Sequence, residues 1–167
     1  MAWGKNGTPS TLGVAGDNFN ISNLTAKKFN QFLMNGWGDA PGVTNTGNNI
    51  TFNNNINSVY AVRYSSNGAA DSTVVSQANI YTRGNRDFEF FEVSYVISIL
   101  GQEKLMILFH VDSSNSGAGS VPIRSEIVGK FVPSPDVGIT RIDYEESDED
   151  GATLYDVGTN LSALGTD

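Results

Sequence analysis

The chain carries one histidine, His110, in a strand-like run that places it on the same face as Met106 and Leu108. A catalytic histidine needs a nucleophile and an orienting carboxylate beside it, and the sequence holds no Gly-x-Ser-x-Gly elbow. With one histidine and no cysteine, it also lacks the donors of a transition-metal site. We therefore interpret His110 as a hydrogen-bonded histidine at a strand end, near the sheet surface.

Carboxylates offer a second kind of chemistry, because a glycoside hydrolase uses two of them about 5–10 Å apart. The candidates, all beside strand-like runs, are Glu89, Glu92, Glu103, Glu126 and Asp143. Charges that alternate with core residues are also typical of the solvent face of a strand, and we adopt that interpretation. The sequence thus predicts no catalytic residue, no bound cofactor and no enzymatic activity.

An acidic stretch near the C-terminus places Glu146, Asp148 and Asp150 at alternate positions before Gly151. This spacing matches the first half of a calcium loop, in which alternate oxygens converge on the ion and a glycine permits the turn. The twelfth position is Val157, so the bidentate carboxylate of such a loop is missing. A solvated acidic loop is our first interpretation, and calcium at a subunit junction is the alternative.

Aromatic residues near Asn-rich loops suggest carbohydrate binding, because exposed rings stack on sugars while polar side chains bond the hydroxyls. The residues considered for sugar stacking are Trp37, Tyr60, Tyr64 and Tyr81. Packing in the core is the competing interpretation of these rings. Trp3 differs from them because it lies outside the core pattern, in the Gly-rich segment 1–17. We expect Trp3 and Pro9 to contact a neighbouring subunit.

The composition favours a single domain built from strands and turns. The 167 residues suffice for one buried core, and only 17% of them are charged. The formal net charge is -8 with ten basic residues, which argues against nucleic acid and anionic membranes as partners, since both attract basic proteins. Enzyme, binding module and structural subunit all remain compatible with this composition.

Strand-like runs follow one another along the chain, separated by turn residues. We predict strands within 19–24, 28–37, 50–53, 59–65, 74–82, 88–111, 123–132, 139–145 and 161–164, with 88–111 broken at 101–103 into a hairpin. Phe90 and Phe91 interrupt the alternation, which indicates a bulge or burial on both faces. About nine or ten strands and no helix predict an all-β fold, an antiparallel two-sheet β-sandwich of jelly-roll type. Residues 18–167 form this domain, and 1–17 form an extended N-terminal arm.

The order of sequence landmarks resembles a known group of domains. The landmarks are Ile21-Ser22-Asn23-Leu24-Thr25, Lys28-Phe29, Thr51-Phe52-Asn53-Asn54, Val59-Tyr60-Ala61-Val62-Arg63, Glu103-Lys104-Leu105, Pro122-Ile123-Arg124, Ile139-Thr140-Arg141-Ile142 and Thr159-Asn160-Leu161-Ser162-Ala163-Leu164-Gly165. Together with the opening 1–9, they resemble jelly-roll domains of phage tail-fibre proteins and small virion-associated proteins of marine phages and archaeal viruses. The resemblance implies a virion-associated protein that oligomerises, and it supplies no catalytic residue.

These observations favour a structural virion protein that self-associates, as a capsid-associated, decoration or fibre subunit. We expect copies of the chain as partners, in a trimer or larger assembly, with other virion proteins or host surface glycans as further partners. Neither nucleic acid nor a membrane is expected. The alternative is a carbohydrate- or receptor-binding module of a viral fibre or cell-surface protein, with an extracellular or cell-surface location instead of the virion.

Overall fold

The structure is a computed structural model that describes residues 2–37, 47–82, 89–113, 117–146 and 155–167. Every regular element in these ranges is a β-strand, and all strand pairs are antiparallel. The strands form two sheets, one of nine strands and one of four. The prediction of an all-β protein with two antiparallel sheets is therefore confirmed.

The larger sheet contains the long strands of the molecule. Its members are β1 (Gly4–Lys5), β2 (Ser10–Thr11), β4 (Phe29–Trp37), β6 (Tyr60–Ser66), β7 (Ser72–Gln77), β9 (Glu89–Ile97), β10 (Lys104–Asp112), β11 (Ile123–Phe131) and β13 (Asn160–Thr166). They follow the order β1-β13-β4-β9-β10-β11-β6-β7, and β2 also pairs with β13. The central position of β9 and β10 makes their hairpin the middle of the sheet.

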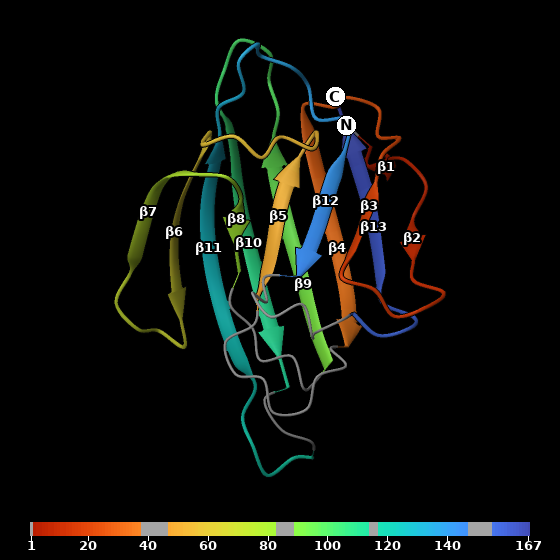
Figure 1. Cartoon of the computed structure of the whole chain (residues 1–167), viewed down its shortest axis with the longest axis vertical. Helices are drawn as coiled ribbons and strands as arrows, with labels where there is room; N and C mark the ends of the chain where they lie inside the picture. The colour runs from red at the N-terminus through yellow and green to blue at the C-terminus, as the bar shows by residue number, and fades with distance from the viewer. Residues whose placement is uncertain (1, 38–46, 83–88, 114–116, 147–154) are drawn as a thin grey trace.

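The smaller sheet lies across one face of the larger one (Figure 1). Its members, in the order β3-β12-β5-β8, are β3 (Asn18–Ile21), β12 (Ile142–Glu146), β5 (Asn48–Phe52) and β8 (Ile80–Tyr81). Aromatic rings join the two sheets, because the ring centroid of Phe52 lies 6.2 Å from that of Phe32 on β4 and 5.7 Å from that of Phe131 on β11. One buried core therefore serves both sheets.

The β9–β10 hairpin is regular where the sequence suggested an irregularity. Phe90 pairs with Asp112 and Phe91 with Val111 in an unbroken register, so the predicted bulge is absent from these strands. Phe90 is buried and Phe91 is exposed, so burial on both faces is also wrong. The two adjacent rings point to opposite faces because a strand alternates its side chains.

A buried lysine fixes the turn of this hairpin. The Nζ of Lys104 donates to the carbonyl oxygens of Ile99 and Gln102, at 2.7 and 2.9 Å, and it also contacts the carboxylate of Asp136. Hydrogen bonds from Lys104 and from the Gly101 amide lower the pKa of Asp136. A buried ammonium group is tolerated here because all three of its protons have acceptors.

Thirteen strands occur in the described ranges, more than the nine or ten predicted. Three of them, β1, β2 and β8, have only two residues, which is too short to produce a periodic signal. β1 and β2 both pair with β13 of the same chain, and Asn6 between them is buried. These parts of the predicted arm 1–17 are thus anchored on their own domain.

We expect the ring of Phe52 to contribute strongly to the stability of the fold, because it contacts aromatic rings on two strands of the opposite sheet. We expect Phe52→Ala to lower the free energy of unfolding by about 3–5 kcal/mol, through lost burial and a cavity between the sheets. Urea unfolding followed by circular dichroism measures this change. The matched control is Val14→Ala, at an exposed position, with an expected change below about 0.5 kcal/mol. Equal stability of the two variants would contradict the shared core.

Candidate functional site

The outer face of the nine-stranded sheet is apolar along its central hairpin. On β10 the outward residues Leu105, Ile107, Phe109 and Val111 are 41–51% exposed, and on β9 the exposed members are Phe91, Tyr95 and Ile97. The outer face of an antiparallel sheet is usually polar when water covers it. We name this surface, completed by the exposed Val128 of β11, the apolar face.

The strand register brings these side chains into one continuous patch. The cross-strand pairs are Leu105 with Ile97, Ile107 with Tyr95, Val111 with Phe91, and Ile107 with Val128. Eight half-exposed side chains of this size expose on the order of 700 Å². The largest patch on a typical monomer is about 300–600 Å², and one partner of a standard interface contributes about 800 Å². The patch thus has the size of a protein interface.

Charged residues border the apolar face on its β6 and β11 side, and on its β4 side the polar Gln31 alternates with Phe29 and Leu33. Gln31 of β4 lies beside Tyr95, and Arg63 of β6 lies beside Val128. Three ion pairs lie toward the β6 and β11 side, namely Arg63–Asp71 at 3.6 Å, Arg124–Glu126 at 3.8 Å and Lys130–Glu103 at 3.0 Å. An apolar centre with a charged rim is the arrangement found in protein–protein interfaces. The three basic groups balance the three acidic ones.

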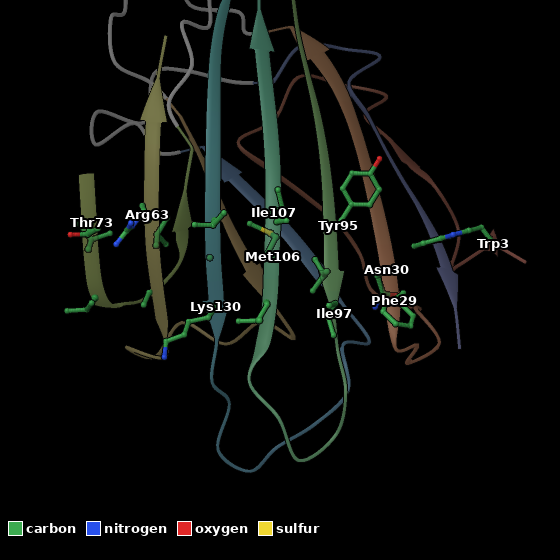
Figure 2. Close-up of a pocket in the computed structure, with 18 residues that line it drawn as sticks. Trp3, Phe29, Asn30, Arg63, Thr73, Tyr95, Ile97, Met106, Ile107 and Lys130 are labelled. Carbon is green, nitrogen blue, oxygen red and sulfur yellow. The ribbon is translucent and has the colours of Figure 1, made fainter. Parts of the chain in front are cut away.

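Part of the apolar face forms a shallow hollow with a volume of about 710 Å³. Trp3 lies at one end of it and Thr73 of β7 at the other, with Tyr95 and Ile107 between them (Figure 2). The sequence prediction identified the β-forming runs but missed this surface. The available signal was that β10 carries apolar side chains at consecutive positions, on both of its faces.

The two residues predicted at a subunit interface occupy different places. Trp3 is exposed and lines the hollow of the apolar face. Pro9 is exposed between β1 and β2, and it is not among the residues that line the hollow. Contact of Trp3 and Pro9 with a neighbouring subunit stays a prediction.

The four residues considered for sugar stacking are not brought together. Tyr60 is 1% exposed and stacks on Phe131 with ring centroids 4.9 Å apart, so its assignment as a stacking residue is wrong and it belongs to the core. Trp37 on β4 and Tyr64 on β6 are separated by four strand spacings, about 19 Å. Tyr81 lies on the other sheet. These rings do not form one platform.

The predicted calcium ligands cannot be placed. Glu146 ends β12, while its side chain, Asp148 and Asp150 lie outside the described residues, so the calcium site stays a prediction. Within the ranges that are described, no group of three or more His, Cys, Asp or Glu residues could hold a metal ion. In the same ranges, no helix is long and apolar enough to span a membrane.

His110 and Glu92 are buried together, which corrects two expectations. The imidazole is 3% exposed and the Glu92 carboxylate 1%, so neither lies at the sheet surface. The two residues face each other across β9 and β10, and His110 Nδ1 donates to Glu92 Oε1 at 2.8 Å. His110 Nε2 lies 3.5 Å from Asp112 Oδ2. A charged ring between two carboxylates is the arrangement that makes its burial tolerable.

The smaller sheet contributes further donors to this cluster. Glu92 Oε1 accepts from Asn48 Nδ2 of β5 at 2.5 Å and from Thr82 Oγ1 at 2.9 Å, and Tyr155 donates its hydroxyl proton to Asn48 Oδ1 at 2.8 Å. Burial lowers the pKa of His110, but the carboxylates of Asp112 and Glu92 outweigh it and raise that pKa to about 9. The cluster therefore joins the two sheets with a positively charged ring at neutral pH.

The raised pKa of His110 makes stability depend on pH. The contribution of the charged ring is complete below the unfolded-state pKa of about 6.5, and it is lost as pH rises through about 9. We expect the free energy of unfolding to fall by on the order of 3 kcal/mol between these values. Burial raises the pKa of the facing Tyr144 well above its usual value, which keeps that hydroxyl neutral in this window.

Urea unfolding at several pH values between 6 and 9 measures the effect. The variant His110→Gln lacks a titrating ring, so its stability should be lower and nearly constant over the same window. A wild-type stability that does not change with pH, or a variant that keeps the wild-type slope, would contradict the assignment of a charged His110.

Comparisons with known proteins do not assign the chain to a family. No protein-family model and no curated protein matches the chain. Among solved structures, the chain is similar to one described as "Structure of the CBM2 module of Lactobacillus casei BL23 phage J-1 evolved Dit", with 13% sequence identity and a TM-score of 0.27. That match covers 95% of this chain and 76% of the other. A TM-score this low does not establish a shared fold.

Proposed function

We propose that the chain is a structural subunit that self-associates through the apolar face, and that its domain is a jelly-roll β-sandwich. The observation that carries the proposal is the patch of half-exposed aliphatic and aromatic side chains on β9 and β10. In water, exposure of such an area is unfavourable by roughly 25 cal/mol per Å². Covering it with a second copy removes this cost for both partners.

The strand order supports the jelly-roll assignment. Along the chain, β3 belongs to the smaller sheet, β4 to the larger, β5 to the smaller, β6 and β7 to the larger, and β8 to the smaller again. The chain then forms β9, β10 and β11 in the larger sheet before β12 returns to the smaller one. Repeated crossing between two antiparallel sheets is the connectivity of double Greek-key sandwiches.

The distribution of charge favours a second copy of the chain as the molecule that covers the apolar face. The chain has a net charge of -8, which opposes close approach of two copies over most surfaces. Beside the apolar face, in contrast, three basic groups pair with three acidic ones. Two copies that meet through this face therefore bring an apolar centre and a neutral rim together. When both partners contribute the same surface to an interface, the smallest assembly is a dimer.

The chemistry of the apolar face disfavours carbohydrate as its ligand. Sugar hydroxyls need hydrogen-bonding partners, whereas Leu105, Ile107 and Val128 offer none. Assignment to a virion, as capsid-associated, decoration or fibre subunit, is supported by the order of sequence landmarks alone. The trimer-or-larger assembly stays a prediction, as does the alternative carbohydrate- or receptor-binding module.

Mutation of the centre of the apolar face tests the proposal. We expect wild-type protein to form a dimer or larger species, and Ile107→Glu to weaken association by at least about 100-fold, because it places an unpaired charge in the interface. Size-exclusion chromatography with light scattering, over a range of concentrations, measures both. Because Ile107 faces away from the core, the variant should keep the wild-type circular dichroism spectrum.

Val14→Glu is the matched control, since it introduces the same charge at an exposed apolar residue outside the apolar face. It should associate like the wild type. A monomeric wild-type protein at about 1 mM would refute self-association. Equal effects of the two substitutions would show that net charge, and not the apolar face, controls association.

A further inference from the structure

The outer face of the smaller sheet carries a polar hollow of about 230 Å³. Six of the residues that line it are Asn20, Thr51, Asn54, Ile56, Arg141 and Asp143. The register explains why they meet, because Asp143 on β12 pairs with Asn20 on β3 and with Thr51 on β5. Three adjacent strands thus present an amide, a carboxylate and a hydroxyl in one row, on the side opposite the core.

A tight turn completes the hollow. Asn53 and Asn54 both have positive φ, at 57 and 54°, a conformation that asparagine adopts more readily than most residues. Asn53 Oδ1 accepts from the amides of Thr140 and Arg141 at 2.9 and 3.1 Å, and its Nδ2 donates to the Gly138 carbonyl at 2.9 Å. The turn that presents Asn54 therefore also holds the backbone that presents Arg141.

The charges in the hollow are already matched. Arg141 Nε donates to both carboxylate oxygens of Asp143, at 2.7 and 2.9 Å, and Nη2 lies 2.5 Å from Oδ1. This pair has no net charge, and the exposed Glu145 beside it disfavours an anion. Among the described residues, no group of three or more His, Cys, Asp or Glu side chains that could hold a metal ion lies here. A neutral ligand suits these electrostatics better than either kind of ion.

Unused hydrogen-bonding groups point to the ligand class. Over the described residues, the side chains of Asn20, Thr51 and Asn54 have no hydrogen-bonding partner, while their neighbours Asn53 and Asp143 are hydrogen-bonded to other residues. Ile56 is 71% exposed at the same hollow, which provides an apolar surface for C–H groups. A ring that carries hydroxyls on its edge and C–H groups on its face matches both features.

We propose that this hollow binds one neutral sugar unit. Its volume is below the roughly 300–1,000 Å³ of pockets for drug-sized ligands, so it accommodates a single ring. The aromatic residues that line it, Phe19 and Tyr144, are buried, so no ring stacks on the sugar and the dissociation constant should be near the millimolar range. The site lies on the sheet opposite the apolar face and does not rest on self-association.

Titration of the ¹⁵N-labelled protein with glucose, galactose, mannose and N-acetylglucosamine tests the proposal. We expect at least one sugar to shift the amide resonances of 18–20, 51–56 and 141–145, with a dissociation constant near about 1 mM. Absence of any shift at about 50 mM of all four sugars would overturn it. Shifts confined to other parts of the protein would overturn it as well.

Two substitutions then assign the contact residues. Thr51→Val replaces the hydroxyl group of a strand residue with a methyl group, and Asn20→Ala removes the amide, so each should weaken binding about 5- to 10-fold. Asn35→Ala is the matched control, because Asn35 is an exposed strand asparagine on the other sheet, and it should bind like the wild type. Unchanged affinity in both Thr51→Val and Asn20→Ala would refute the site.

Discussion

The β9–β10 hairpin places apolar side chains on both faces of the larger sheet, whereas the buried hydrophobic residues that the structure describes form one core, on the inner face. Side chains alternate along a strand. Because Met106 and Leu108 are buried on one side of β10, Ile107 and Phe109 lie on the other. The four strands of the smaller sheet cover the inner face. The outer face is left to solvent or to another molecule, and our proposal of self-association rests on this constraint.

Two different interactions hold the sheets together. Around Phe52, aromatic rings pack without polar groups, and this part stabilises by burial of apolar area. Around Glu92, the hydrogen bond from Asn48 joins β5 of the smaller sheet to β9 of the larger one, and the bond from His110 joins β10 to β9. Buried ion pairs add little net stability relative to apolar packing. Their directional bonds do, however, fix where β5 lies over β9, which nondirectional apolar contacts leave free.

The sequence predicted what depends on periodicity and missed what depends on contacts distant along the chain. The runs 28–37 and 123–132 are predicted as strands, and β4 and β11 lie within them. The two-residue strand β1 exists only because β13 lies beside it. Burial of Glu92 could not be predicted, because its partner Asn48 is 44 residues away. The apolar face was missed because the pattern of a strand does not tell which of its apolar faces another sheet covers.

The two outer surfaces differ in what they can bind, and the difference follows from their strands. The outward positions of β9 and β10 carry aliphatic and aromatic groups, whereas Asn20, Thr51 and Asp143 carry amide, hydroxyl and carboxylate groups. If copies associate through the apolar face, the smaller sheet of each copy remains directed to solvent. An assembly built this way would display the polar hollow on its outside, where a free ligand can reach every copy.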